Sequence, residues 1–189
     1  MDRPVRVGAR VFISPHASVS GDVVLADDAS VWPMAVLRGD VNCIRVGART
    51  SIQDGAVVHV THESAWAPQG LPTILGDDVT VGHAAVLHAC TIGNRCLIGM
   101  GAIILDGAVI EDEAMVAAGA VVTPGTVVKA RTLWRGNPAR YARDMSPEEV
   151  ARMAYSAAHY VRMKELYLAA GGRHSEIKPL TDINESLES

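Results

Sequence analysis

The sequence predicts an all-β solenoid followed by a single α-helix, and three observations lead to this fold class. Aliphatic residues recur every six positions over most of the 189-residue chain. Aromatic residues make up only 4% of the chain, so Val, Ile, Leu and Ala must fill the interior. A helical spacing of apolar residues appears only after residue 146, which excludes an alternation of strands and helices.

The six-residue period starts at Val7 and ends near Leu133, which gives nineteen hexads. The aliphatic residues that carry it are Val7, Ile13, Val19, Leu25, Val31, Leu37, Val46, Ile52, Val58, Leu75, Val81, Leu87, Ile92, Ile98, Ile104, Ile110, Val116, Val122 and Val128. The register slips by three residues near 40–44 and breaks across a polar segment at about 62–73. Because that segment contains Pro and Gly, we expect a loop that leaves the solenoid.

Each hexad supplies one short strand and a corner, so three hexads complete a triangular coil whose aliphatic side chains point inward. Stacked coils pair their backbone groups as parallel strands at a spacing of ~4.8 Å. Nineteen hexads therefore build a little over six coils, and we assign residues 1–135 to this β-helix domain.

The chain changes character after the repeat. The segment Gly136–Arg140 contains Gly, Asn and Pro and redirects the chain. Ser146, Pro147 and Glu149 have the spacing of a capping box with Pro at the first helical position, and apolar residues then follow at helical spacing up to Gly171. We assign 136–172 to a linker and a helix packed on the β-helix, and 173–189 to a polar tail.

Composition narrows the function classes. The formal charge of −4 and the pI of about 5.9 leave no basic surface for nucleic acid. No apolar run approaches the ~20 residues of a membrane span, and the N-terminus has no secretory signal. Three cysteines are an odd number without paired spacing, as expected for reduced thiols in the cytoplasm.

Hexads three apart lie on the same face of a triangular solenoid, so the face of each polar residue follows from its position. Arg38, His59 and His88 are the second residues of the hexads that begin at Leu37, Val58 and Leu87, and they stack on one face. The hexads of Ile52 and Val81 share a different face, with the polar residues Gln53, Asp54 and His83.

Histidines in this pattern indicate a metal site, because zinc takes three or four N, O or S ligands. His59 and His88 are one coil apart and can both reach one ion. His83 precedes His88 by five residues of near-extended chain, which separates their Cα atoms by up to ~15 Å. A three-histidine site therefore needs His83 from a second subunit, with the metal between subunits. The alternative is that these are solvated surface histidines.

The remaining polar candidates receive structural interpretations. We interpret His16, His159 and His174 as surface histidines, and Glu111 and Asp112 as solvated charges at corners. Cys90 is either a thiolate ligand or a small interior residue, and the second interpretation is favoured. Cys43 and Cys96 are interpreted as structural.

The motifs around these residues resemble the γ-class carbonic anhydrases, and most closely their compact YrdA/PaaY-like subgroup. The resemblance runs from Ile13 through the C-terminal helix, and its motifs are Arg38-Gly39-Asp40-Val41-Asn42, Ser51-Ile52-Gln53-Asp54-Gly55, Val58-His59 and Val81-Gly82-His83-Ala84-Ala85-Val86-Leu87-His88. It implies a left-handed parallel β-helix that assembles as a homotrimer with metal sites at the interfaces. The implied ligands are His59 and His88 from one subunit and His83 from its neighbour.

The resemblance also implies roles for neighbouring residues. Arg38 and Asp40 match an ion pair that helps to hold the trimer, Gln53 matches the residue that hydrogen-bonds the zinc-bound water, and Asp54 supports the ligand region. Arg38, Asp40 and Asp54 could equally serve assembly alone. Tyr160 matches a polar neighbour of the site in some relatives.

The proton shuttle departs from the family pattern. At the two positions where the best-characterised members have acidic residues near the metal, this chain has Val41 and His62. His62 is therefore our candidate shuttle, since an imidazole exchanges protons near neutral pH. Glu63 is a second candidate.

These observations favour a cytoplasmic, zinc-dependent enzyme that reversibly hydrates CO2 to bicarbonate, with Fe2+ or Co2+ as alternative metals. One alternative is an acyl-CoA thioesterase or acyltransferase, because hexapeptide β-helices also host those enzymes and the transferases use one histidine as a general base. The other is a metal-binding trimer with little catalytic activity. We expect neither nucleic acid nor a membrane as a partner.

Overall fold

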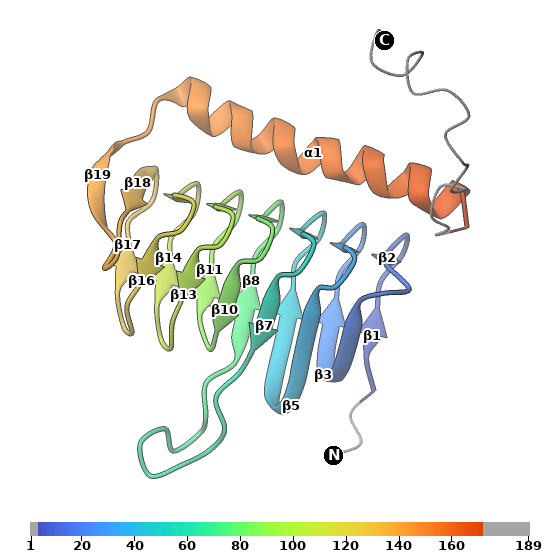
Figure 1. Ribbon diagram of the computed structural model, residues 1–189, viewed down its shortest axis with the longest axis horizontal. Coiled ribbons are helices and arrows are strands. Elements are labelled where there is room, and N and C mark those ends of the chain that lie inside the picture. The colour runs from blue at the N-terminus through green and yellow to red at the C-terminus, as the bar shows by residue number, and fades with distance from the viewer. Residues whose placement is uncertain (1–3, 172–189) are drawn as a thin grey trace, which may run out of the picture.

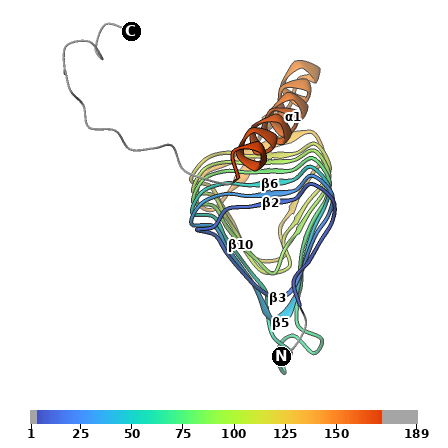
Figure 2. The same cartoon turned by 90° about the vertical axis from the view of Figure 1, so that its right-hand side faces the viewer.

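Short parallel strands stack into a triangular solenoid of about seven turns, and one long helix lies along it (Figure 1). The computed structural model describes residues 4–171. Figure 2, which looks along the solenoid, shows a flat side under the helix and two sides that meet at an apex near β3 and β5. The predicted β-helix with a C-terminal helix is confirmed. His174 and the tail at 173–189 lie outside the described residues.

Three faces make up the triangle. Face 1 contains the first halves of β3 (Ser18–Leu25) and β5 (Val36–Val46), together with β7 (Val57–His59), β10 (Val86–His88), β13 (Ile103–Ile104) and β16 (Val121–Val122). Face 2 contains β1 (Arg6–Val7), the second halves of β3 and β5, β8 (Thr73–Leu75), β11 (Thr91–Ile92), β14 (Val109–Ile110) and β17 (Val127–Val128). Face 3 contains β2 (Phe12–Ile13), β4 (Ser30–Val31), β6 (Ser51–Ile52), β9 (Thr80–Val81), β12 (Leu97–Ile98), β15 (Met115–Val116), β18 (Thr132–Arg135) and β19 (Arg140–Asp144).

The hexad register agrees with the predicted faces. Leu37, Val58 and Leu87 are partners on face 1, and Ile52 and Val81 are partners on face 3. Because the register is correct, polar residues next to these positions lie on the faces and corners that the sequence predicts.

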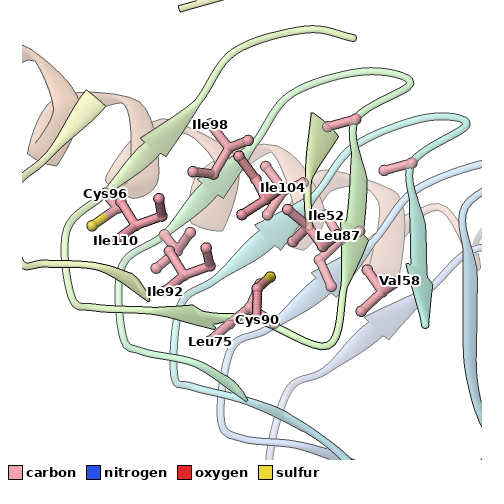
Figure 3. Close-up of a cluster of buried hydrophobic side chains, with 14 of the residues drawn as sticks. Ile52, Val58, Leu75, Leu87, Cys90, Ile92, Cys96, Ile98, Ile104 and Ile110 are labelled. Carbon is pink, nitrogen blue, oxygen red and sulfur yellow. The ribbon is translucent and has the colours of Figure 1, made fainter. Parts of the chain in front are cut away.

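The interior is a stack of aliphatic side chains, as Figure 3 shows for Ile52, Leu87 and Ile104, which point toward one another. Two residues of the repeat depart from this pattern: Val7 is 54% exposed and Ile13 is 36% exposed. They belong to the first coil, where no earlier coil covers them, so the prediction that they point into a closed interior was wrong.

One corner, between faces 2 and 3, has residues of alternating charge on successive coils. All of them have a positive φ, in the left-handed region that disfavours side chains: Arg10, Asp28, Arg49, Asp78, Arg95, Glu113 and Arg131. Ion pairs between neighbouring coils offset this strain, among them Arg49 with Asp78 at 2.7 Å and Arg95 with Glu113 at 2.9 Å.

Beside this column, two residues that we interpreted as solvated charges are structural. Glu111 accepts hydrogen bonds from Lys129 Nζ and the Ala130 backbone, both at 3.0 Å, and Asp112 accepts one from the Asn94 backbone at 2.8 Å. The stacking of coils brings these corner residues together, so they tie one coil to the next.

The helix α1 (Pro147–Ala169) begins with the predicted capping box on Ser146 and Glu149. It packs on β2, β4, β6 and β9 of face 3. Beneath it lies a cluster of aromatic rings with centroids 5.1–5.9 Å apart, which consists of Phe12, Trp32, Tyr160 and Tyr167. These four aromatic side chains therefore attach the helix to the solenoid and do not fill its interior. The described helix is not long and apolar enough to cross a membrane.

The segment after the repeat is more regular than the linker that we expected. Residues Arg140–Asp144 form β19, which pairs antiparallel with β18. A hairpin forms here because the last coil has a free strand edge on face 3, and the returning chain pairs with it.

The polar segment between β7 and β8 leaves the solenoid as a loop near the apex, seen below β7 and β8 in Figure 1. Its base is closed by pairing of Thr61 with Leu71, and its tip by pairing of Ser64 with Ala67. The side-chain amide of Asn42 on β5 donates to the carbonyl oxygens of Thr61 and Gln69 at 3.3 Å. The loop is therefore held to the rest of the apex at its base.

Candidate metal centre

His59 and His88 lie side by side on adjacent strands of face 1. They are direct partners in the pairing of β7 with β10, and their ring centroids are 5.2 Å apart. Nδ1 of His59 is 3.2 Å from Nε2 of His88. The predicted stacking of these two histidines is therefore present in a single chain.

Each of these histidines has its own carboxylate on the nitrogen that faces away from the other ring. Nε2 of His59 is 3.0 Å from Oδ1 of Asp40, one coil below, and Nδ1 of His88 is 2.9 Å from Oδ2 of Asp106, one coil above. An ionised carboxylate only accepts hydrogen bonds, so those two nitrogens have the protons. The nitrogens that face each other are then left with their lone pairs.

The pKa of both carboxyls lies below the usual range. For Asp40, the hydrogen bond with His59 is the main cause, with a further contribution from Arg38. For Asp106, burial acts to raise the pKa, but hydrogen bonds with Thr61 and His88 outweigh it. Both groups are therefore ionised at neutral pH, as the assignment of the protons requires.

Two facing lone pairs are a suitable pair of ligands for a cation. Two nitrogens bound to Zn2+ at ~2.0–2.1 Å with tetrahedral geometry are about 3.3 Å apart, which is close to the 3.2 Å seen between His59 and His88. Metal-ligating histidines also commonly donate their other N–H to a carboxylate. The donor set therefore fits a transition-metal ion such as Zn2+.

His83 lies at the opposite edge of face 1, at the corner between β9 and β10. Its Nδ1 is 3.1 Å from Oδ2 of Asp54, and its backbone N–H donates to Oε1 of the buried Gln53 at 3.2 Å. The third histidine thus has a carboxylate partner too. Among residues 4–171, no group of three or more His, Cys, Asp or Glu side chains is placed to hold a metal.

Tyr160 of α1 lies near the edge of face 1 that contains His83 and Asp54. Its pKa is raised by burial and by the negative charge of Asp54, and its ring lies against Trp32 at 5.9 Å between centroids. The structure therefore places Tyr160, Asp54, Gln53 and His83 at one edge of face 1, away from the edge with His59 and His88.

Arg38 pairs with Asp40 within one chain. The resemblance implied that these two residues form an ion pair at the interface, and here Asp40 also binds His59. Because Asp40 faces both Arg38 and His59, it links the half-exposed guanidinium to one candidate ligand.

His62 and Glu63 are exposed at the start of the loop. Within the part of the chain that the structure describes, neither makes a hydrogen bond or an ion pair, so they stay candidates for a proton shuttle on position alone.

The two buried cysteines, Cys90 and Cys96, are not suited to bind a metal ion. Cys90 is buried in the interior, and burial, together with the charge of Asp106, raises its pKa to about 12. Burial likewise raises the pKa of Cys96 to about 12. Both thiols stay protonated, which supports the structural interpretation of Cys90 and Cys96 over a thiolate ligand.

Asp106 is the residue that our reading of the sequence missed. The hexad that begins at Ile104 stacks on that of Leu87, and Asp106 is its third residue. Extending the column of His59 and His88 by one coil leads to Leu105, and Asp106 is the next residue along the chain, so the stacking register alone does not point to it. Our sequence analysis also missed Thr61, whose hydroxyl donates to Oδ1 of Asp106.

Comparisons with known proteins agree with this architecture. The model of the bacterial transferase hexapeptide (six repeats) matches residues 89–124. The chain is 49% identical over 168 residues to the protein YrdA of Escherichia coli K12, covering 89% of this chain and 91% of that protein. It is 45% identical over 159 residues to a probable carbonic anhydrase of Methanocaldococcus jannaschii, covering 84% of this chain and 96% of that one.

A solved structure described as a putative acetyltransferase of Bacillus cereus superposes with a TM-score of 0.84 at 36% identity, covering 89% of this chain and 94% of that chain. With its hexad solenoid and with these identities over nearly whole chains, the protein belongs to the hexapeptide-repeat family that contains YrdA and the γ-class carbonic anhydrases.

Proposed function

We propose that this protein is a zinc-dependent carbonic anhydrase that reversibly hydrates CO2 to bicarbonate at sites between the subunits of a homotrimer. His59 and His88 of one subunit and His83 of the next would hold the metal. One observation carries this proposal: each of the three histidines lies against its own carboxylate, Asp40, Asp106 or Asp54. Surface histidines without a shared role have no reason to show this pattern three times.

The donor set favours Zn2+, and Fe2+ or Co2+ are the alternative metals, because neutral imidazole nitrogens suit all three. When bound, such an ion supplies Lewis-acid chemistry that lowers the pKa of a water ligand from 15.7 to about 7. The carboxylates keep the imidazoles oriented for that task.

Gln53 is placed to orient a small oxygen-containing substrate. Its side-chain oxygen already accepts a hydrogen bond from the backbone N–H of His83. The amide NH2 group is therefore what Gln53 presents to a ligand, and it suits the oxygen atoms of CO2 or bicarbonate. Gln53 is buried, so this donor is held in a fixed direction.

The surface between the two halves of the site supports assembly with further copies of the chain. The outward side chains of face 1 between its two edges are apolar on five successive coils: Val36, Val57, Val86, Ile103 and Val121. Val57 is 37% exposed in the single chain, and Met100, one coil above His83, is 59% exposed. An apolar stripe of this kind is typical of a protein interface.

The two halves of the site lie at opposite edges of that stripe. A cyclic, head-to-tail arrangement would bring the His83 edge of one copy to the His59 and His88 edge of the next. Three such contacts close a ring with three equivalent sites. The three cysteines are free thiols, which supports a cytoplasmic location as part of this proposal.

The proposal is tested on protein of known metal content. Zinc-loaded wild type should hydrate CO2 in stopped-flow assays, and chelation should remove the activity. His59→Ala should lower activity by more than about 100-fold, beyond the 10- to 100-fold typical of changes around the ligands. His16→Ala, which removes an exposed histidine in the first coil that is not part of the proposed donor set, is the matched control. A zinc-loaded trimer with no hydration activity would instead support a metal-binding trimer.

The same protein preparations distinguish a carbonic anhydrase from an acyl-transfer enzyme, because acyl transfer needs one histidine as a general base and no metal. Turnover of acyl-CoA by metal-free protein, unchanged in His83→Ala, would support that class of enzyme and contradict our proposal.

A further inference from the structure

A carboxylate and a hydroxyl near the apex connect His88 to the insertion loop. Oδ2 of Asp106 is 2.9 Å from Nδ1 of His88, and Oδ1 accepts the hydroxyl hydrogen bond of Thr61. Thr61 is the residue that closes the base of the loop by pairing with Leu71. Both oxygens of Asp106 thus have a defined partner, which fixes the plane of the carboxylate.

The backbone around Asp106 is equally well held. Gly107, with a φ of +67°, donates its N–H to the carbonyl oxygen of Ala89 at 2.7 Å, and Ile104 is in register with Leu87. Asp106 therefore stays one coil above His88 without depending on the hydrogen bond to the ring.

The direction of this hydrogen bond decides which nitrogen of His88 can bind a metal. Because Asp106 accepts, the proton of the neutral ring is placed on Nδ1 and the lone pair on Nε2. Nε2 is the atom that lies 3.2 Å from Nδ1 of His59. Without Asp106, the proton can move to Nε2 and remove that lone pair.

We infer that Asp106 is a positioning residue that holds His88 in its metal-binding tautomer, and that Thr61 couples this arrangement to the insertion loop. The metal-binding consequence rests on the proposed function, since it takes His88 as a ligand. The assignment of the tautomer stands on the contacts alone.

The experiment compares wild type with Asp106→Ala. Zinc affinity of the metal-free protein is measured by competition with a chelator, and the tautomer of His88 by nitrogen chemical shifts in NMR. We expect zinc affinity to fall by about 10- to 100-fold in Asp106→Ala. The Nδ1-protonated form of His88 should be present in wild type and lost in the variant. Asp112→Ala removes a carboxylate from a different corner and should leave both measurements unchanged.

If Asp106→Ala does not fold, variants of Thr61 test whether the hydrogen bonds of Asp106 affect zinc binding. Thr61→Val removes the hydroxyl at similar volume, and loss of one hydrogen bond should weaken zinc binding about 5-fold. Thr61→Ser keeps the hydroxyl and should restore the wild-type affinity. Unchanged zinc affinity in Thr61→Val would overturn the role of Thr61.

The inference and the proposed function can fail separately. Wild-type zinc affinity and an Nδ1-protonated His88 in Asp106→Ala would overturn the role of Asp106, while the metal site stands. If wild type takes up no zinc but His88 changes tautomer in Asp106→Ala, the proposed function fails and the positioning role is supported.

Discussion

Some polar side chains near the apex are held in place by several hydrogen bonds, whereas others are exposed to solvent. Asp40 and Asp106 each contact a histidine ring at 3.0 Å or less, and both have further partners in Arg38 and Thr61. His62 lies only three residues after His59, yet its side chain is exposed. If His62 is the proton shuttle, its exposed side chain is free to exchange protons with solvent, whereas the two carboxylates hold the histidine rings in fixed orientations.

The shuttle is testable at this scale. If His62 moves protons between the site and solvent, His62→Ala should lower the CO2 hydration rate in weak buffer, and a high concentration of imidazole should restore it. Stopped-flow rates at several buffer concentrations measure this effect. Glu63→Gln is the companion variant: a buffer-dependent loss there, together with an unchanged rate in His62→Ala, would assign the shuttle to Glu63.

Among the elements, the helix α1 is also joined to the solenoid by a buried ammonium, that of Lys164. The ammonium of Lys164 is fully buried, and its Nζ is 2.7 Å from Oδ1 of Asp28. Arg10 also pairs with Asp28, at 2.5 Å. The hydrogen bond with Arg10 is the largest cause that lowers the pKa of Asp28 to about 2, and Lys164 adds to it against the opposing effect of burial.

Asp28→Asn should leave the buried ammonium of Lys164 with only the more distant carboxylate of Glu165, at 3.8 Å. Breaking a buried pair in this way costs about 3 kcal/mol, which corresponds to a fall in Tm of about 6–12 °C for a chain of this size. Thermal unfolding followed by circular dichroism at pH 7 measures it. Asp78→Asn on the same corner, whose partner Arg49 is partly exposed, should cost less than about 1 kcal/mol.

The difference in Tm between wild type and Asp28→Asn should depend on pH, because the pKa of Asp28 is lowered in the folded state. The folded state keeps Asp28 ionised down to about pH 2, whereas the unfolded chain takes up the proton near the ordinary value of 3.8. The stabilisation is therefore complete well above pH 4 and is lost as the pH falls from about 4 to 2. The difference in Tm between wild type and Asp28→Asn should narrow over that range. A difference independent of pH would contradict this origin.

For the whole molecule, the decisive feature is that the two opposite edges of face 1 hold different parts of the candidate site. His59 and His88 are brought together within a chain, and His83 is held at the other edge of face 1 with Asp54. Assembly would therefore be a condition for metal binding and not only for stability, because an isolated chain offers two of the three histidines.

A mixture of two inactive variants tests this division. His59→Ala and His83→Ala should each be nearly inactive as pure trimers, since every interface then lacks a ligand. In cyclic trimers assembled at random from equal amounts of both, roughly a quarter of the interfaces combine intact His59 and His88 with an intact His83. Activity and zinc content near that fraction are expected. Mixed trimers, verified by mass spectrometry, that stay inactive would place all ligands within one chain.

The sequence by itself determined the solenoid, its faces and the stacking of His59 on His88. This was possible because a six-residue period repeats with the coils, so spacing along the chain translates directly into position on a face. The register of Leu37, Val58 and Leu87 is the one that the spacing predicts. The separation of His83 from the other two histidines follows from the same geometry.

Only the tertiary structure decided the contacts between side chains that do not occupy equivalent positions in their hexads. Asp106 reaches His88, and Lys164 reaches Asp28 across 136 positions of the sequence. The exposure of Val7 and the pairing of β19 with β18 also depend on which strand edges the stacked coils leave open. The period specifies where a backbone position lies and which aliphatic side chains point inward, but it does not specify how a polar side chain is directed or which partner it meets. Those are set by packing in three dimensions.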